Sequence, residues 1–194
     1  VLRNKENYNL GGTHKTGFNY AIKNNYHYVT ILHGDDQGDI NDLNKVFKDN
    51  LYLHYDCLLG SRFTRKSKLI NYPKFRIYAN WLINLAGSIV TLKYLTDLGS
   101  GLNMFKVDYL KNKFYLNFPN DLTFNYCLIF YICHSRCKFL FFPITWREDD
   151  QISNVKLFSH AFKWSKIVLR FIFNKKKLFN NKNLKNIDYK FENE

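Results

Sequence analysis

A short apolar run followed at once by an acidic turn constrains this chain more than any other feature. Residues 28–32 are Tyr, Val, Thr, Ile and Leu, and residues 33–39 are His, Gly, Asp, Asp, Gln, Gly and Asp. The run is typical of a strand buried on both faces. Carboxylates spaced by glycines where such a strand ends are the groups that bind a hard cation. Aspartate and glycine are also the ordinary residues of a turn, so both interpretations stay open.

Helical and strand patterns alternate around this turn. Thr13 is a candidate helix N-cap, and a helix is expected from there to about Asn24. A second helix is expected from about Ile40 to Asn50, and a short strand follows at residues 56–60. Strand, helix and strand in this order predict an α/β domain with a mostly parallel sheet flanked by helices.

The middle of the chain continues with both kinds of element. Large apolar residues recur at helical spacing between residues 75 and 95, so this segment is expected to be an amphipathic helix with its apolar stripe on the core. A strand at 103–107, a helix at about 122–135 and a strand at 138–146 follow, and Pro143 indicates an edge or a bulge in the last of these. The stripe consists of Tyr78, Trp81, Leu82, Leu85, Ile89 and Leu92.

The segment 155–173 is strongly apolar but carries basic residues along one helical face. Four Lys or Arg make it a poor spanning helix. A basic face opposite an aromatic and aliphatic one is typical of an amphipathic helix lying in the membrane interface. The alternative is a surface helix packed on its own domain. The basic face comprises Lys156, His160, Lys163, Lys166 and Arg170, and the basic tail at 174–194 is expected to be disordered.

The overall composition limits the classes of partner. The 194 residues suit a single domain, and 46% hydrophobic with 18% aromatic residues is the composition of a folded protein. The formal net charge of +13 favours polyanions, which include nucleic acid, an anionic membrane surface and phosphorylated substrates. No zinc finger, recognition helix or aromatic RNA-binding pair supports the nucleic-acid alternative, so no nucleic-acid partner is expected.

The cysteines and the first residue bear on compartment and completeness. The four cysteines form no CxxC pair, which indicates a reducing compartment. Cys133, His134 and Cys137 have the spacing of a zinc site, but their apolar surroundings favour buried structural cysteines. The chain starts at Val1, without an initiator or a signal-peptide pattern, so its N-terminal part is expected to be missing.

Five short motifs occur in the order found in one enzyme family, and together they cover about residues 1–160. The chain resembles the family 2 glycosyltransferases, which have the GT-A (Rossmann-like) fold, and is closest in pattern to the polyprenyl-phosphate (dolichol-phosphate) sugar transferases. The motifs are Gly11-Gly12-Thr13 with Gly17, Gly34-Asp35-Asp36-Gln37, Gly60-Ser61-Arg62-Phe63, Thr96-Asp97 with Ser100-Gly101, and Trp146-Arg147-Glu148 with Ser153 and Lys156.

The resemblance implies a division of the chain. Residues 1–154 would be a partial GT-A domain that lacks its first strands, 155–173 an amphipathic interfacial helix and 174–194 the tail. The family's missing strands grip the base and ribose of the donor, so an N-terminal segment encoded upstream is a possible partner. An unpaired sheet edge would be left behind.

The resemblance also implies a metal-dependent, inverting sugar transfer from a nucleoside diphosphate sugar to a polyprenyl-phosphate or glycan acceptor. The location would be cytoplasmic, on the inner face of the membrane. Mg²⁺ or Mn²⁺ would neutralise the leaving diphosphate. Asp35 and Gln37 match the family's metal-binding positions, and His33 stands where the family has an aspartate. Imidazole suits Mn²⁺ better than Mg²⁺. The donor-binding group comprises His33, Gly34, Asp36 and Arg62.

The family positions for the acceptor fall in the second half of the chain. Asp97 matches the residue that orients or deprotonates the acceptor. A lipid phosphate is already an anion, so Asp97 would then position it, whereas a sugar hydroxyl would need a base. The alternative is a catalytically inactive relative that serves as a binding subunit. The residues expected to bind the acceptor or its phosphate are Arg76, Ser100, Gly101, Arg147, Ser153 and Lys156.

Overall fold

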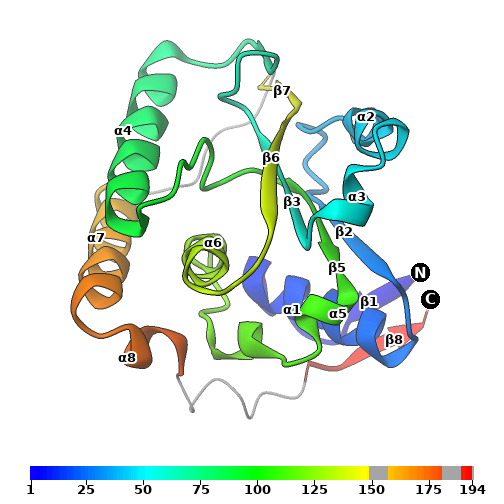
Figure 1. Ribbon diagram of the computed structural model, residues 1–194. Coiled ribbons are helices and arrows are strands. Elements are labelled where there is room, and N and C mark those ends of the chain that lie inside the picture. Colours follow the sequence, from blue (N-terminus) through cyan, green and yellow to red (C-terminus); the bar gives the residue numbers. More distant parts are fainter. Residues whose placement is uncertain (149–156, 181–188, 194) are drawn as a thin grey trace.

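A four-stranded mixed sheet forms the centre of the molecule (Figure 1). The computed structural model describes residues 1–148, 157–180 and 189–193. The strand order is β2-β5-β3-β6, and two further pairs of short strands lie outside this sheet. The four strands are β2 (Tyr28–Leu32), β5 (Leu102–Lys106), β3 (Cys57–Ser61) and β6 (Phe139–Pro143).

The alternation of elements predicts a mostly parallel sheet, but the observed sheet is mixed. Strands β3 and β6 are parallel, but β5 lies between β2 and β3 and is antiparallel to both. Three strands therefore point the same way, in keeping with the alternation. The fourth is reversed because β5 begins beside the ends of β2 and β3, where Leu102 pairs with Leu32 and Asn103 with Leu59. A strand that begins at that end of the sheet must run antiparallel to β2 and β3.

Strand β2 lies at an edge of the sheet, although its composition predicts burial on both faces. Its residues are half-buried, and the Leu32 side chain is 40% exposed. Within the described ranges, no strand pairs with the outer edge of β2. An apolar, β-branched edge of this kind is unusual, because exposed edge strands normally carry charges or proline.

Alternating residues of the sheet supply two hydrophobic clusters, one on each face. Phe105 packs in the larger cluster with Phe18 of α1 and Phe130 of α6, and its neighbour Met104 packs in the smaller cluster with Val46 of α2. Figure 1 shows α6 on one side of the sheet and α2 with α3 on the other. The helices are α1 (Asn9–Lys23), η1 (Ile40–Asp42), α2 (Leu43–Lys48), α3 (Leu51–His54), α5 (Val107–Leu110), η2 (Phe114–Asn117) and α6 (Phe124–His134).

Several boundaries differ from those expected. Helix α1 begins at Asn9, so Thr13 is inside it, where its hydroxyl donates to the Asn9 carbonyl at 3.0 Å. The single helix expected at 40–50 is divided into η1 and α2, and the further short helix α3 follows it. The strand expected at 138–146 is divided at Ile144, and β6 is an outer strand, as Pro143 indicates. Its continuation β7 (Thr145–Arg147) pairs in parallel with β4 (Lys68–Ile70).

The C-terminal segments pack against the rest of the chain. Helix α7 (Leu157–Phe173) contacts α4 and α6, and buries Ile167 and Phe171. Within the tail, α8 (Lys175–Phe179) buries Leu178, and β8 (Phe191–Asn193) pairs antiparallel with β1 (Leu2–Asn4). Of the helices in the described ranges, none has the length and apolar character needed to cross a membrane.

Lys15 connects distant segments from inside the protein. It is completely buried, and its ammonium donates to the Phe118 carbonyl, to Asn120 Oδ1 at 2.7 Å and to the Tyr189 hydroxyl at 3.1 Å. Burial lowers the pKa of Lys15 to about 8. Three hydrogen bonds satisfy the ammonium, so α1 is tied to the loop after η2 and to Tyr189, two residues ahead of β8.

In helix α4 (Lys74–Thr91) the polar side faces the interior, which is the reverse of the expected arrangement. Its apolar stripe faces outward: Tyr78, Trp81 and Ile89 are 67%, 57% and 65% exposed. The residues it buries are Asn84 and Gly87. The periodicity was therefore helical, but the prediction that the apolar stripe lies on the core is wrong. The reason is that polar side chains of α4 bind the loop beyond it.

Phe130 supplies a test of the larger cluster. It is completely buried and packs on Phe171 with ring centroids 5.0 Å apart. Phe130→Ala should lower the free energy of unfolding by about 3–5 kcal/mol, through lost burial and the cavity left behind. Urea denaturation followed by circular dichroism measures the change. Phe47→Ala, at a 48% exposed position, is the matched control, and an equal loss in both variants would contradict the assignment of the core.

Candidate functional site

The acidic turn after β2 is held against β5 and β7. The His33 N–H donates to the Gly101 carbonyl at 3.0 Å, and Gly38 forms a bridge with Trp146. A Cβ at Gly101 would lie 2.7 Å from His33 Nδ1 and 2.9 Å from Trp146, so only glycine lets the imidazole and the indole approach here. The turn therefore lies at the carboxyl end of β2, where open α/β sheets bind ligands.

The carboxylates of the turn point in different directions. Asp35 Oδ1 accepts from the Gln37 N–H at 3.3 Å. Asp36 has a positive φ of 57° and pairs with Arg147 at 3.0 Å, while the Arg147 N–H donates to the Gln37 carbonyl at 2.8 Å. The Asp36 side chain is 93% and the Arg147 side chain 48% exposed, so this ion pair is weak. An incoming anion can displace the Asp36 carboxylate and bind Arg147.

A pocket of about 450 Å³ lies between α1 and β2. His14 from α1 and His33 from the turn meet in its wall, with ring centroids 5.7 Å apart. His14 Nδ1 and His33 Nε2 are both buried without a hydrogen-bond partner. Two unpaired imidazole nitrogens in one wall are groups that a ligand can satisfy. The pocket is lined by Leu10, Thr13, His14, Thr30, Ile31, Leu32, His33, Gly34 and Asp35.

Both imidazoles are neutral at physiological pH. Burial, together with a smaller effect of the neighbouring His33, lowers the pKa of His14 to about 3. Burial also lowers the pKa of His33, against the opposing effect of Asp35, and the charge of Arg62 contributes in the same direction as burial. Neutral imidazole offers one donor and one acceptor nitrogen, or one metal ligand.

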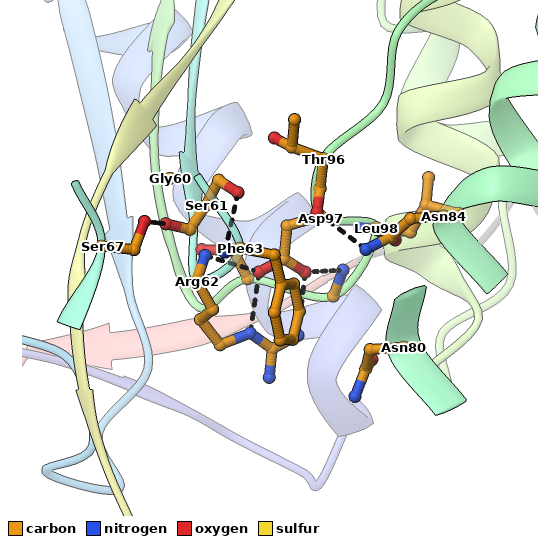
Figure 2. A network of polar contacts seen from close by, with 12 residues as sticks. Gly60, Ser61, Arg62, Phe63, Ser67, Asn80, Asn84, Thr96, Asp97 and Leu98 are labelled. Carbon is orange, nitrogen blue, oxygen red and sulfur yellow. Dashed lines mark hydrogen bonds and ion pairs between the residues drawn. The ribbon is translucent and has the colours of Figure 1, made fainter. Parts of the chain in front are cut away.

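Arg62 and Asp97 form a buried ion pair (Figure 2). Asp97 Oδ1 accepts from Arg62 Nη2 at 2.8 Å and from the Gly99 N–H at 2.9 Å. Asp97 Oδ2 accepts from Arg62 Nε at 2.7 Å and from the Arg62 N–H at 2.9 Å. Burial opposes the charge of Arg62, but Asp97 outweighs it and raises the pKa of the guanidinium. With both oxygens saturated, Asp97 is suited to holding a position and not to taking up a proton.

The polar inner side of α4 fixes the loop that carries Asp97. Asn84 Nδ2 donates to the Thr96 carbonyl at 2.7 Å, and Asn84 Oδ1 accepts from the Leu98 N–H at 3.1 Å. Figure 2 shows Asn84 beside Leu98 and Asp97. Ser100 is buried and binds back to the Leu102 N–H at 3.3 Å. Ser100 therefore shapes the turn and offers no exposed group to a ligand.

Trp146 joins the two halves of the site. The Arg62 guanidinium carbon lies 5.3 Å from the centroid of its ring, and also packs on Phe63 and Tyr72. Gly38 and Gly101 also lie against the indole. The acidic turn, the loop after β3 and the loop before β5 thus meet around one buried tryptophan, as far as the described side chains show.

The remaining predicted phosphate-binding residues lie toward α4 or outside the described residues. Arg76, in the first turn of α4, pairs with Glu148, whose side chain is only 8% exposed. The Glu148 Oε2 atom has no partner. Ser153 and Lys156 fall at 149–156, outside the described residues. The structure therefore brings together His33, Asp35, Arg62, Asp97 and Gly101, with Arg147 and Arg76 at the margins.

The donor set fits a cation only in part. Asp35 and Gln37 offer oxygen ligands, and His33 Nε2 is an unpaired imidazole nitrogen. Among the residues the structure describes, no three groups from His, Cys, Asp and Glu converge as a metal site would require. A cation here would therefore take much of its coordination from a ligand's own oxygens, as Mg²⁺ and Mn²⁺ do at phosphate sites.

Three residues of this region are absent from the sequence-based set. His14 is a lone histidine in a helix, and nothing in its spacing to His33 indicates that they meet. Asn84 is hidden by the apolar stripe of α4. Trp146 lies in one of the five family motifs, so that motif could have identified it as a residue of the site.

Comparisons with known proteins give a distant relationship. No family model matches the chain. A protein of Methanocaldococcus jannaschii named uncharacterized protein MJ1222 is 31% identical over 111 residues, which cover 57% of this chain and 46% of that protein. The undecaprenyl-phosphate mannosyltransferase of Micrococcus luteus is 24% identical over 111 residues, or 57% of this chain and 45% of that enzyme. The matched part therefore spans less than half of each relative. The chain is distantly similar to a glycosyltransferase.

The buried His14 should make stability depend on pH. Its pKa is 6.5 in the unfolded chain and about 3 in the folded one, so below pH 6.5 the unfolded state binds the proton first. Stability should fall between pH 6.5 and about 3 by a few kcal/mol, at about 1.4 kcal/mol per pKa unit. Urea midpoints across this range should change less in His14→Gln. In the exposed control His27→Gln the dependence should equal that of the natural protein, and equal slopes in all three would contradict the prediction.

The ion pair should contribute to the fold. Asp97→Asn leaves the Arg62 charge buried without its counter-charge, so the free energy of unfolding should fall by about 3–5 kcal/mol. The double variant Arg62→Met/Asp97→Leu removes both charges and should recover much of that loss. Thermal denaturation measures both. A single variant as stable as the natural protein would contradict the buried pairing.

Proposed function

We propose that the chain is part of a glycosyltransferase that moves a sugar from a nucleoside diphosphate sugar to a polyprenyl-phosphate acceptor, or to a glycan, at a membrane face. The observation that carries the proposal is the meeting of the acidic turn with the Arg62–Asp97 loop around Trp146, at the carboxyl end of β2. The distant similarity to an undecaprenyl-phosphate mannosyltransferase supports the same reaction class.

Donor binding is proposed for the acidic turn. Asp35 and Gln37 would hold Mg²⁺ or Mn²⁺ together with the donor diphosphate, and the unpaired His33 Nε2 would meet the metal or a phosphate oxygen. When bound, the cation would supply charge neutralisation for the departing diphosphate. Gly34 and Asp36 would line the approach. A nitrogen among the ligands favours Mn²⁺ over Mg²⁺.

Acceptor binding is proposed for the cations around this turn. Arg147 donates to the exposed Asp36 carboxylate and to the Asp36 carbonyl at 3.3 Å, and a phosphate can displace that carboxylate. Arg76 is proposed for the same role, Ser100 and Gly101 would contribute through the shape of their turn, and Ser153 and Lys156 are proposed from the sequence alone. Asp97 would keep Arg62 in place beneath the acceptor, with only Nη1 of that guanidinium directed away from the carboxylate. A lipid phosphate needs no base, which agrees with the saturated Asp97.

A second candidate is a catalytically inactive relative that binds the nucleotide sugar without turning it over. It is favoured by His33 in place of a carboxylate and by an Asp97 that has no free oxygen. A sugar hydroxyl acceptor would make this alternative more attractive, since that reaction requires a general base.

Asp35→Ala distinguishes these functions. The protein expressed from its natural gene would be assayed with Mn²⁺, labelled nucleoside diphosphate sugars and undecaprenyl phosphate. We expect transfer, and a loss of roughly a hundredfold or more in kcat/KM on removing the carboxylate. Asp39→Ala, in the same turn, is the control and should keep activity. Mn²⁺ binding with nucleoside diphosphate, followed by electron paramagnetic resonance, should weaken in parallel. Binding without transfer would favour the inactive relative, and neither binding nor transfer would contradict both.

A further inference from the structure

Helix α4 turns a polar stripe inward. Asn80 Nδ2 donates to the Tyr72 hydroxyl at 3.2 Å, and Asn84 binds Thr96 and Leu98 as described above. Ser88 Oγ accepts from the Leu95 N–H at 3.0 Å. These contacts leave the helix only one orientation. The polar side of α4 forms hydrogen bonds within the protein, and the apolar side is therefore held outward.

The outward side of α4 is far more apolar than a solvent-exposed helix normally is. Its large side chains are between 43% and 67% exposed, and the turn after the helix extends them, with Leu92 87% and Tyr94 83% exposed. Leu92 also has a positive φ of 55°, an uncommon conformation for a leucine. The side chains on the helix are Phe75, Tyr78, Trp81, Leu82, Leu85 and Ile89.

Helix α7 continues this surface. It lies beside α4 (Figure 1) and buries Ile167 and Phe171 against the domain. Four of its apolar side chains are exposed: Phe162 at 64%, Phe173 at 81%, and also Leu169 and Ile172. The outward side chains of α4, of residues 92–94 and of α7 are called the α4–α7 face below. Contiguous apolar patches of this kind mark interaction sites.

Positive charges predominate around the α4–α7 face. Residues 57–96 and 151–187 contain no Asp or Glu. Exposed Lys74 and Lys93 flank the two ends of α4, and exposed Lys166 and Arg170 lie on α7. The charge of Lys163 is partly neutralised by Asp121, which it contacts at 2.6 Å. The face therefore combines an apolar centre with a cationic rim.

We propose that the α4–α7 face docks on a lipid bilayer containing anionic lipids. Apolar side chains, amphipathic aromatics such as Trp81 and Tyr94, and a rim of lysine and arginine match the acyl, interfacial and phosphate layers of a bilayer in turn. A second copy of the chain would bring the same cations together, and repulsion between them would oppose that contact. The sequence pattern predicts an interfacial role for α7 alone, whereas the structure adds α4 as the larger part of the surface.

The docking surface adjoins the candidate site. Arg76 in the first turn of α4 pairs with Glu148, and Asn80 reaches Tyr72, whose hydroxyl also contacts Arg62 at 3.4 Å. A bilayer on this face would present lipid headgroups beside the loops that are proposed to bind an acceptor phosphate. This deepens the proposed function, but the docking itself requires no sugar, nucleotide or metal.

Vesicle co-sedimentation without substrate tests the apolar centre. The probe is vesicles of equimolar phosphatidylcholine and phosphatidylglycerol. Trp81→Gln/Leu82→Gln/Ile89→Gln replaces exposed side chains only, and should weaken partitioning roughly a hundredfold. The matched control is Ile40→Gln/Phe47→Gln/Leu53→Gln, whose three positions are 48%, 48% and 54% exposed on η1, α2 and α3. The control should partition like the natural protein. Equal partitioning of both triple variants would overturn the proposal.

A second pair of variants tests the cationic rim. Lys166→Gln/Arg170→Gln should weaken binding by about fivefold for each cation removed, and pure phosphatidylcholine should bind much less than the mixture. Lys23→Gln/Lys48→Gln is the matched control for net charge and should change binding little. Loss of binding to the same extent in both pairs would mean that net charge alone drives the association, which contradicts a defined face.

Trp81 reports which partner covers the face. Lipids brominated on their acyl chains should quench its fluorescence, and Trp81→Phe should lose most of that quenching while keeping affinity within about threefold. Sedimentation velocity without lipid should give a monomer. A dimer that the triple variant of α4 dissociates, with no quenching by brominated lipid, would assign the face to a second copy and overturn the bilayer. Because no substrate is present, these results stand apart from failure of sugar transfer.

Discussion

The pairing of Arg62 with Asp97 is the interaction on which the rest of the site depends. Two charges buried together are costly, and the cost is offset only because every oxygen of the carboxylate is bonded and the guanidinium lies among three aromatic rings. The pair joins the end of β3 to the loop before β5. It also sets the position of Trp146, and through that ring the position of the acidic turn.

The same pair explains why α4 is built as it is. The loop that presents Asp97 is irregular, so its backbone groups need partners that a regular strand or helix would not need. Asn84 and Ser88 provide them from α4. A helix that offers polar groups to the interior must turn its apolar residues elsewhere. The apolar face of α4 is thus exposed because its polar face is needed to hold the loop.

Sequence patterns predicted which segments form strands and helices better than how those segments are placed. The apolar run before the acidic turn is a strand, and the periodic segments are helices. Periodicity finds a stripe on a helix but not the direction in which the stripe points, and α4 shows the difference. Composition likewise predicted that β2 is buried on both faces, whereas its residues are half-buried and it lies at an edge. In the site, Asp35 and Arg62 could be selected from motifs. The meeting of His14 with His33 could not, because it depends on how α1 packs against β2.

The reversed strand β5 has a consequence for the order of folding. Strands β2 and β3 are both made before β5, and neither pairs with the other, because β5 separates them. Both therefore remain without their shared neighbour until the chain has passed through α4, and β3 gains its second partner only when β6 follows. Such long-range pairing slows folding and prolongs the exposure of apolar strands. During synthesis on the ribosome, two unpaired strands must wait for a third, and that interval is when a nascent chain of this kind most needs a chaperone.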